Sequence, residues 1–316
     1  MLRRKNRCRP GVTPIPLPHD RPRSTRRNRA APPNRSLRRL GRTVPSVANR
    51  VYFLGDRLVL RIARPEAADD LRKEAIVIPA AVRAGVRTPE MVDFDDGRDV
   101  LDTPYMVLRR AIGITPGLPT EPGDERWRAA YRELGAELAA LHANIEALPE
   151  VPVDTAGDPR SDVSRLAEAG YIGPDLADWL TGWFDRLESR CPANTPVRII
   201  HGDASPTNLL VDSDSKRLTA ILDWGDAAWA DPATEFAKLP LRAVPSVLEG
   251  YLDEPDESDE HWTARILRHH LHWAIGRIPT PPDPQAAHWS AQPGNRLLEI
   301  MRFLHADPPH PWPSLR

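Results

Sequence analysis

Cysteine and long apolar runs are both scarce in this sequence of 316 residues. The two cysteines, Cys8 and Cys191, are too few and too far apart to indicate a disulfide scaffold or a zinc site, as is typical of a reducing compartment. No apolar stretch approaches the roughly 20 residues that a membrane-spanning helix needs. We therefore expect a cytoplasmic protein with no membrane partner.

Acidic residues are nearly absent from the first 42 positions. This stretch holds 13 Arg and 1 Lys against the single acid Asp20, so its net charge of +13 is hidden in a total of -1. Residues 1–40 also contain seven prolines and show no apolar periodicity, which predicts a disordered tail. The tail is either a dispensable extension, an Arg-rich transit segment or a contact for nucleic acid. We expect no other nucleic-acid partner.

Residues 41–112 are predicted to form a small β-rich lobe. Two β-type runs, 51–54 and 58–62, flank a Gly-Asp turn, and two further strands are predicted at 91–94 and 105–108, with a turn at 95–97. Between these pairs, apolar residues recur at helical spacing from Leu71 to Val82. The pattern predicts an antiparallel sheet with one helix.

Residues 113–316 are predicted to be mainly helical, after a hinge near residues 109–113. Helical segments are expected from about Asp124 and over about 175–189, the first with a face of apolar residues: Trp127, Tyr131, Leu134, Leu138 and Leu141. A strand at 197–200 and a hairpin of 209–211 with 218–222 interrupt the helices. The fold class is therefore α+β, with two lobes as in protein kinases.

The most informative motif lies around these strands. It reads His201-Gly202-Asp203, with Asn208 five residues after the Asp, and then Asp223-Trp224-Gly225 after the hairpin. Phosphoryl transfer needs such a set, because one carboxylate must meet the acceptor hydroxyl while an amide oxygen and a second carboxylate hold Mg²⁺. Asp and Asn are also common turn and cap residues, but that reading does not explain three groups in this order.

A buried ion pair is predicted in the small lobe. Glu74 lies between Leu71 and Ile78 on the apolar face of its helix, where a carboxylate needs a partner, and Arg61 on the preceding strand is the natural one. Such a pair holds the α- and β-phosphates in kinase-like sites, although it can also be purely structural. The segment from Gly41 to Asn49, with Ser46, would close over the triphosphate.

The chain resembles the aminoglycoside phosphotransferase family, whose members share the protein-kinase-like fold and include choline and homoserine kinases. The resemblance covers about Gly41–Leu239, more loosely to residue 305. It rests on the His201-Gly202-Asp203 motif with Asn208 and on four further stretches: Ile221-Leu222-Asp223-Trp224, Ala230-Asp231-Pro232, Glu235-Phe236-Ala237 and Leu138–His142.

The resemblance implies a role for each candidate residue. Asp203 would be the catalytic base, Asn208 and Asp223 the Mg²⁺ ligands, and Arg61, braced by Glu74, would stand where the family often has Lys. Adenine would lie against the backbone between Leu108 and Ala111, with Ser46 and Asn49 on the nucleotide side. The expected activity is transfer of the γ-phosphate of ATP or GTP to an alcohol group of a small molecule.

The acceptor is left open by the sequence. Asp226–Asp231 is predicted to run directly into a helix, which leaves no room for the activation loop of a protein kinase and favours a small-molecule acceptor. The acidic cluster Asp253–Glu260 is either a rim for a cationic compound such as an aminoglycoside or a solvated loop. Choline, homoserine or related metabolites are alternative acceptors. A catalytically silent nucleotide-binding scaffold is the alternative function.

Two further groups of residues, Asp226 and a late aromatic and histidine cluster, have two interpretations. Asp226 is either a supporting residue of the site or a solvated turn residue, whereas Asp231, which precedes a proline, is predicted to be a helix N-cap. A late helix carries Trp262, Trp273 and three histidines, 269, 270 and 272. These residues are expected to pack the core or face solvent, with an aromatic wall for the acceptor as the alternative.

Overall fold

The computed structural model describes residues 43–44, 49–97, 100–155, 157–252, 259–285 and 288–316. All of them belong to the part of the chain that begins at Leu40. The predicted tail, Ser46 and most of the acidic cluster Asp253–Glu260 lie outside the described residues. No helix in the described ranges is both long enough and apolar enough to cross a membrane.

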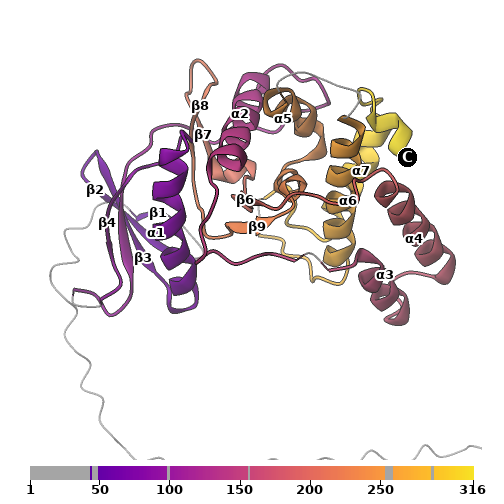
Figure 1. The fold of residues 1–316 in the computed structure, drawn as a ribbon, viewed down its shortest axis with the longest axis horizontal. Coiled ribbons are helices and arrows are strands. Elements are labelled where there is room, and N and C mark those ends of the chain that lie inside the picture. The colour runs from indigo at the N-terminus through magenta and orange to yellow at the C-terminus, as the bar shows by residue number, and fades with distance from the viewer. Residues whose placement is uncertain (1–42, 45–48, 98–99, 156, 253–258, 286–287) are drawn as a thin grey trace, which may run out of the picture. The chain divides into compact units, whose positions relative to one another are not determined.

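Five strands of the described chain form an antiparallel sheet in the order β1-β2-β3-β5-β4 (Figure 1). They are β1 (Thr43–Val44), β2 (Asn49–Leu54), β3 (Leu58–Ala63), β4 (Met91–Asp95) and β5 (Tyr105–Arg109). The predicted hairpin is confirmed: β2 pairs with β3 so that Val51 lies opposite Arg61. The two further strands are confirmed as β4 and β5, and Asp95 accepts a turn hydrogen bond from the Gly97 N–H (2.8 Å).

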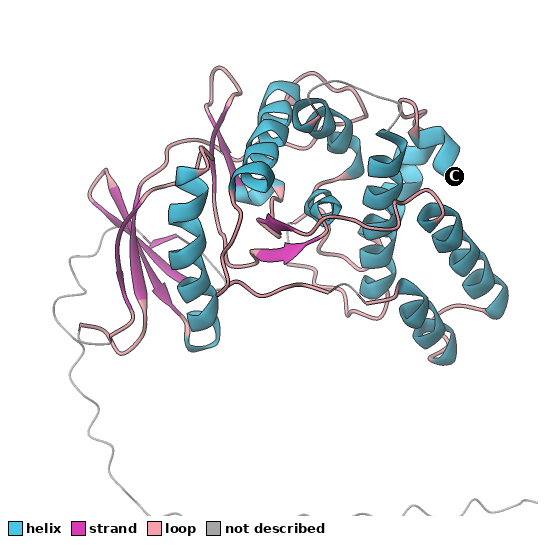
Figure 2. Ribbon diagram, viewed as in Figure 1, coloured by secondary structure: helices cyan, strands magenta, loops and turns pink. Residues whose placement is uncertain are grey.

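Helix α1 (Ala68–Arg83) packs on this sheet, as Figure 2 shows. Its buried side recurs at helical spacing and comprises Leu71, Glu74, Val77, Ile78 and Ala81. The predicted inward position of Glu74 is therefore confirmed, since only 1% of this residue is exposed.

The remainder of the described chain is mainly helical (Figure 2). Its helices are α2 (Arg128–Asn144), α3 (Pro159–Glu168), α4 (Pro174–Glu188), α5 (Val244–Tyr251), α6 (Asp259–Arg277) and α7 (Asn295–His305). The predicted apolar face of α2 is buried, with Leu134, Leu138 and Leu141 fully inside. Helix α3 was not predicted, because only Val163 and Leu166 mark its buried side.

Two small ribbons of strands carry the motif. Strand β6 (Arg198–Ile200) pairs with β9 (Ala228–Ala230), and β7 (Leu209–Val211) pairs with β8 (Leu218–Ile221). The segment Asp226–Asp231 leads directly into a short helix, Pro232–Lys238, as predicted, but it contains strand β9, which was not predicted. Ala-Trp-Ala has no local strand signal, and its pairing with β6 is a contact that only the tertiary fold forms.

Arg87 joins the loop before β4 to the helical part of the chain. Its backbone N–H and its Nε each donate to Glu137 at 2.6 Å, and its Nη1 donates to the Leu218 carbonyl at 2.7 Å. The Ile221 N–H in turn donates to the Arg87 carbonyl at 2.8 Å. These bonds hold the β7–β8 ribbon, and with it Asp223, next to the small lobe.

Helices α2 and α5 cross closely at two glycines. A methyl group on Gly135 would overlap the carbonyl oxygen of Val247, and one on Gly250 would overlap that of Arg132. The backbones of the two helices therefore approach to a distance that only glycine permits at these positions.

This contact predicts that Gly135→Ala destabilises the fold by about 1–3 kcal/mol through overpacking, although alanine is the better helix former. Urea unfolding would measure the change. Gly182→Ala in α4 is the matched control, because the nearest atom to its new methyl group would be Arg186 Nη1 at 3.6 Å. Equal stabilities of the two variants would contradict the close crossing.

Candidate active site

The motif residues converge at the ends of the two ribbons. Asp203 and Asn208 lie between β6 and β7, and Asp223 follows β8. The Leu222 N–H donates to the Asn208 carbonyl at 2.8 Å, which places Asn208 beside Asp223. Asp223 has a φ of +68°, a left-handed conformation that Asp and Asn adopt more readily than most residues. The fold thus brings together three polar groups that the sequence separates by up to 20 positions.

Asp203 is held between an amide and an ammonium group. Its Oδ2 accepts a hydrogen bond from Asn208 Nδ2 (2.8 Å), and its Oδ1 lies 3.9 Å from Lys238 Nζ. Burial raises the pKa of the Asp203 carboxyl above its ordinary value, while Lys238, His201 and the bond from Asn208 oppose this rise. A carboxylate in this setting can accept a proton at a higher pH than a free one.

His201 and Glu235 bind the backbone of the loop between β6 and β7. The Asp203 N–H donates to His201 Nδ1 (3.1 Å), so the ring proton must be on Nε2, which donates to the Leu222 carbonyl (3.0 Å). Glu235 is fully buried and accepts from the N–H groups of His201 (2.6 Å) and Gly202 (3.2 Å). Despite its burial, His142 and His201 hold the pKa of Glu235 below its ordinary value.

Gly202 is required by the same loop. Its φ is +80°, and a Cβ there would overlap the carbonyl oxygen of Asp226. Glu235 and Gly202 belong to the quoted motifs, but no role was predicted for either. The sequence feature that could have indicated Glu235 is its position beside the apolar pair Phe236-Ala237. A carboxylate buried with such residues needs hydrogen-bond partners.

The predicted pair of Arg61 and Glu74 forms and extends to Asp223. Arg61 binds both Glu74 oxygens through its two terminal nitrogens, and Nη2 also donates to Asp223 Oδ1 (2.8 Å). Burial raises the pKa of Glu74 to about 7, although Arg61 opposes this rise. Arg61 therefore links the sheet, helix α1 and the residue that follows β8.

A cavity of about 490 Å³, here called cavity A, opens beside Arg61. Arg61, Asn208 and Asp223 line it together with the segment Leu108–Gly113, which contains the predicted adenine positions Leu108 and Ala111. Asn49 does not line cavity A, because it is buried at the start of β2. Ser46 is not among the described residues.

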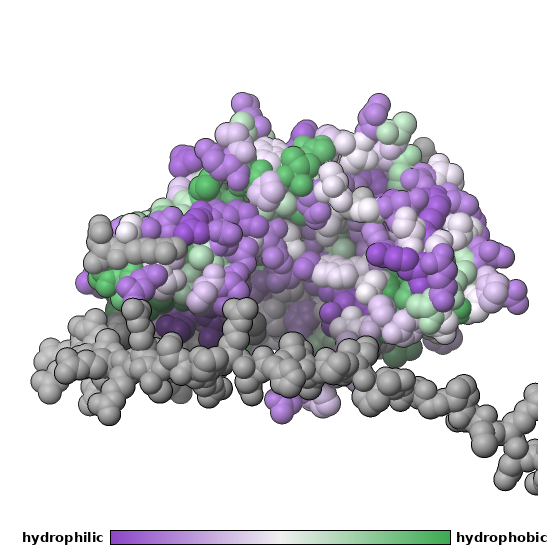
Figure 3. Space-filling view, turned by 90° about the horizontal axis from the view of Figure 1, so that it is seen from below, coloured by the Kyte–Doolittle hydropathy of each residue, from purple (hydrophilic) through white to green (hydrophobic). Residues whose placement is uncertain are grey.

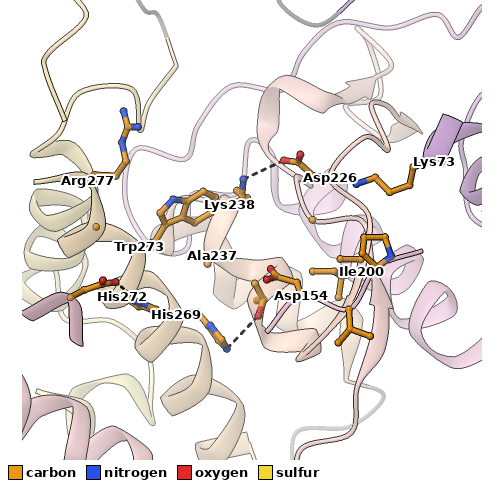
Figure 4. A pocket seen from close by; sticks show the side chains of 17 residues that line it. Lys73, Asp154, Ile200, Asp226, Ala237, Lys238, His269, His272, Trp273 and Arg277 are labelled. Atoms are coloured by element: carbon orange, nitrogen blue, oxygen red, sulfur yellow. Dashed lines mark hydrogen bonds and ion pairs between the residues drawn. The ribbon is translucent and has the colours of Figure 1, made fainter. Parts of the chain in front are cut away.

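A second cavity of about 680 Å³, here called cavity B, includes Gly202, the residue before Asp203, in its lining (Figure 4). Gly202, Asp226, Lys238, His269, His272 and Trp273 are among its lining residues. Asp226, for which two readings were open, thus faces cavity B and pairs with Lys238 at 3.6 Å. Lys238 had not been predicted as a site residue, because only the tertiary fold brings it near Asp203.

The late-helix residues divide between site and core. Three of them line cavity B, namely His269, His272 and Trp273. His270 is instead buried and bonds the Phe236 carbonyl (3.0 Å). Trp262 packs on Tyr251. Asp231 is the predicted N-cap: its Oδ1 accepts from the Ala233 N–H (2.8 Å), and it also binds Arg265 and His269.

The donors present fit a magnesium ion. Asn208 uses its Nδ2 for Asp203, which leaves Oδ1 to face a ligand, and the Asp223 side chain is 48% exposed in cavity A. An amide oxygen and a carboxylate are hard oxygen donors, and Mg²⁺ takes one or two such groups beside waters and phosphates.

Comparison with known proteins identifies the family of this chain. A sequence profile of the phosphotransferase enzyme family matches residues 41–266. An aminoglycoside 3'-phosphotransferase of Streptomyces fradiae is 29% identical over 55% of this chain and 65% of its own length. Acyl-CoA dehydrogenase family member 10 of Mus musculus is 25% identical over 66% of this chain, but over only 21% of its own length. The chain thus spans less than two thirds of either relative.

Solved structures show the same fold. A GDP complex of an aminoglycoside 2'-phosphotransferase is 21% identical and covers 76% of this chain and 86% of its own, with a TM-score of 0.55. A choline/ethanolamine kinase family protein from Mesorhizobium loti is 19% identical and covers 84% of this chain and 86% of its own, with a TM-score of 0.56. The predicted α+β, kinase-like fold is confirmed. By its profile match, this chain belongs to the phosphotransferase enzyme family, the aminoglycoside phosphotransferase family that its motifs resembled.

Proposed function

We propose that this chain is an O-phosphotransferase that moves the γ-phosphate of ATP or GTP to a hydroxyl group of a small molecule, with Mg²⁺. The observation that supports this most is that Asp203 contacts one lining residue of each cavity. It bonds Asn208, which lines cavity A, and lies 3.9 Å from Lys238, which lines cavity B. A donor nucleotide in A and an acceptor in B would meet at this carboxylate.

In the proposed reaction the acceptor hydroxyl gives its proton to Asp203 as its oxygen bonds to the γ-phosphorus. The bond from that phosphorus to the β–γ bridging oxygen breaks, and the nucleoside diphosphate leaves with the electron pair. Arg61, fixed by Glu74, would balance charge on the phosphates. Asn208 and Asp223 would hold Mg²⁺, which supplies charge neutralisation on the phosphate oxygens when bound.

The names of the relatives suggest which acceptors to test. An aminoglycoside or related antibiotic is the first class, and a metabolite alcohol such as choline is the second. Homoserine, expected from the family resemblance, belongs to the same second class. Similar solved structures are complexes with GDP, ADP or ATP, which supports testing both ATP and GTP as donors. A catalytically silent scaffold would bind nucleotide but transfer phosphate to none of these acceptors.

Asp223→Asn should abolish Mg²⁺-dependent binding of ATP, because the variant loses a charged metal ligand. Calorimetric titration with ATP in the presence and absence of Mg²⁺ would measure this. Asp214→Asn, an exposed residue on the turn between β7 and β8, is the matched control and should bind as the wild type does. Unchanged affinity in Asp223→Asn would rule out the proposed metal role.

The pH dependence of turnover should reflect Asp203. Its pKa is raised by burial, and the group must be ionised to accept a proton, so kcat should fall as the pH is lowered through that raised pKa. Lys238 opposes the rise, and Lys238→Met should therefore move the acidic limb of the profile to higher pH. The measurement is kcat against pH, with Lys216→Met as a control. A limb that stays in place or moves to lower pH would contradict the assignment.

A further inference from the structure

Two cations, Lys238 and Arg277, lie near Trp273 in the lining of cavity B. Three cations line it, namely Lys73, Lys238 and Arg277, against three acids, Asp154, Asp162 and Asp226 (Figure 4). Two of the acids already have partners: Asp162 binds His272 at 2.8 Å as well as Arg165, and Asp226 pairs with Lys238 at 3.6 Å. Lys238 also lies 3.9 Å from Asp203, so it faces two carboxylates, whereas Arg277 has no ion pair among the described residues. Asp154 lies apart from Arg277 in the close view.

Two cations lie against the ring of Trp273 on α6. The ring lies 3.9 Å from Lys238 Nζ and 3.5 Å from the guanidinium carbon of Arg296. Arg296 is buried and donates only to neutral groups, the Ala237 carbonyl (2.9 Å) and the Ser290 hydroxyl (3.0 Å). Within the described residues, no carboxylate lies at ion-pair distance from it. A buried cation without a carboxylate is costly unless an anion comes near.

The positive potential extends around the Trp273 end of the cavity. Arg277 is one helical turn from Trp273 on α6, and its Nη2 donates to a carbonyl, that of Ala291 (3.0 Å). Burial and then the charge of Arg277 lower the pKa of Arg296 to about 9, although the charge of Asp203 opposes this fall. Burial, Arg296 and Lys238 likewise lower the pKa of His288. Another cation brought to this end would meet the same repulsion.

We infer that cavity B takes an acceptor that carries an anionic group, a carboxylate or a phosphate, bound by Lys238 and Arg277 beside Trp273. The rest of the acceptor would extend so that a hydroxyl group meets Asp203, which is 3.9 Å from the same lysine. This inference rests on the proposed function and specifies its substrate class. It favours anionic acceptors over polycations such as aminoglycosides, because a polycation would have to approach Lys238 and Arg277.

Equilibrium binding of four related sugars tests this charge preference without nucleotide. D-Glucose is neutral, D-glucosamine cationic, D-gluconate carries a carboxylate and D-glucose 6-phosphate a phosphate. Calorimetry at low ionic strength should show tighter binding of at least one anion than of glucose or glucosamine. The preferred anion identifies the charged group. Lys238→Met or Arg277→Gln should weaken that binding about tenfold, as expected for loss of a charged hydrogen bond.

Two control variants locate the bound anion. Lys216 also lies near a tryptophan ring, that of Trp127 (5.5 Å), but it does not line cavity B. Lys216→Met should therefore leave binding of the anion unchanged. Arg61→Gln reports binding in cavity A. Lys238→Arg should restore the affinity that Lys238→Met loses, and thermal melting confirms that each variant is folded.

Several outcomes would overturn the inference. They are tightest binding of glucosamine, equal binding of all four sugars, or anion binding that is lost in Arg61→Gln and kept in Lys238→Met. The proposed function fails by a different result, namely absence of both Mg²⁺–ATP binding and phosphate transfer. Because the sugar titrations contain no nucleotide, the two failures can be told apart.

Discussion

Asp203→Asn should lower kcat by a factor of about 10²–10⁴, the usual contribution of a general base. The amide is nearly isosteric, and its oxygen can still accept the hydrogen bond that Asn208 Nδ2 now donates to Asp203 Oδ2. The fold and cavity A should therefore be unaffected, and only the capacity to accept the hydroxyl proton is lost. Steady-state turnover with any acceptor found for the wild type measures the effect.

The control for this variant is nucleotide binding. Since Asp203 does not line cavity A, Mg²⁺–ATP should bind Asp203→Asn and the wild type equally well. Turnover at the wild-type rate would exclude Asp203 as the base. Loss of turnover together with loss of nucleotide binding would instead indicate that the loop between β6 and β7 no longer folds.

Glu235→Gln should destabilise the protein by about 3–5 kcal/mol, as expected when one member of a buried charged network is removed. Glu235 accepts from two backbone N–H groups with its two oxygens, and glutamine has only one carbonyl oxygen to offer. Its NH₂ group would face a second donor in a fully buried position. The free energy of unfolding in urea measures the loss.

The effect should extend to turnover, because the two N–H groups belong to His201 and Gly202, directly before Asp203. Glu249→Gln is the control: Glu249 pairs with Arg128 on the surface, where such a pair contributes about 0–1 kcal/mol. If the two glutamine variants unfold at the same urea concentration, Glu235 is not the support proposed for this loop.

The surface of the described residues differs in character from the charged groups of the site. Seen from below, the part of the face that the described residues form is mainly hydrophilic, with apolar side chains in scattered patches (Figure 3). The charges that matter to the proposed chemistry are instead partly or wholly inside, such as Arg61, Glu74 and Glu235. Burial increases the strength of their interactions and makes the loss of any one partner costly.

Local patterns in the sequence were sufficient for the elements and for the order of the motif. The β2–β3 hairpin follows from two β-type runs around a Gly-Asp turn, and the inward side of α1 follows from apolar residues at helical spacing. Glu74 could be paired with Arg61 because a carboxylate on that buried side requires a cation and only a short segment separates them.

Strand β9 and helix α3 could not be predicted in the same way. Ala-Trp-Ala carries no alternation long enough to indicate a strand, and α3 shows two buried apolar residues over ten positions. Both depend on partners elsewhere in the chain, β6 for the strand and α4 with α6 for the helix. Tertiary packing decides such short elements because their intrinsic preferences are weak.

The sequence by itself determined the spacing of Asp203, Asn208 and Asp223, the family that this spacing indicates, and the α+β fold. Only the tertiary structure decided that Lys238 lies 3.9 Å from Asp203 and that Glu235 supports the loop before it. It also decided that Arg296 and Lys238 both face Trp273. These contacts join residues 23 to 35 positions apart through turns and packed helices, and no periodic pattern of side chains encodes distances across such a path.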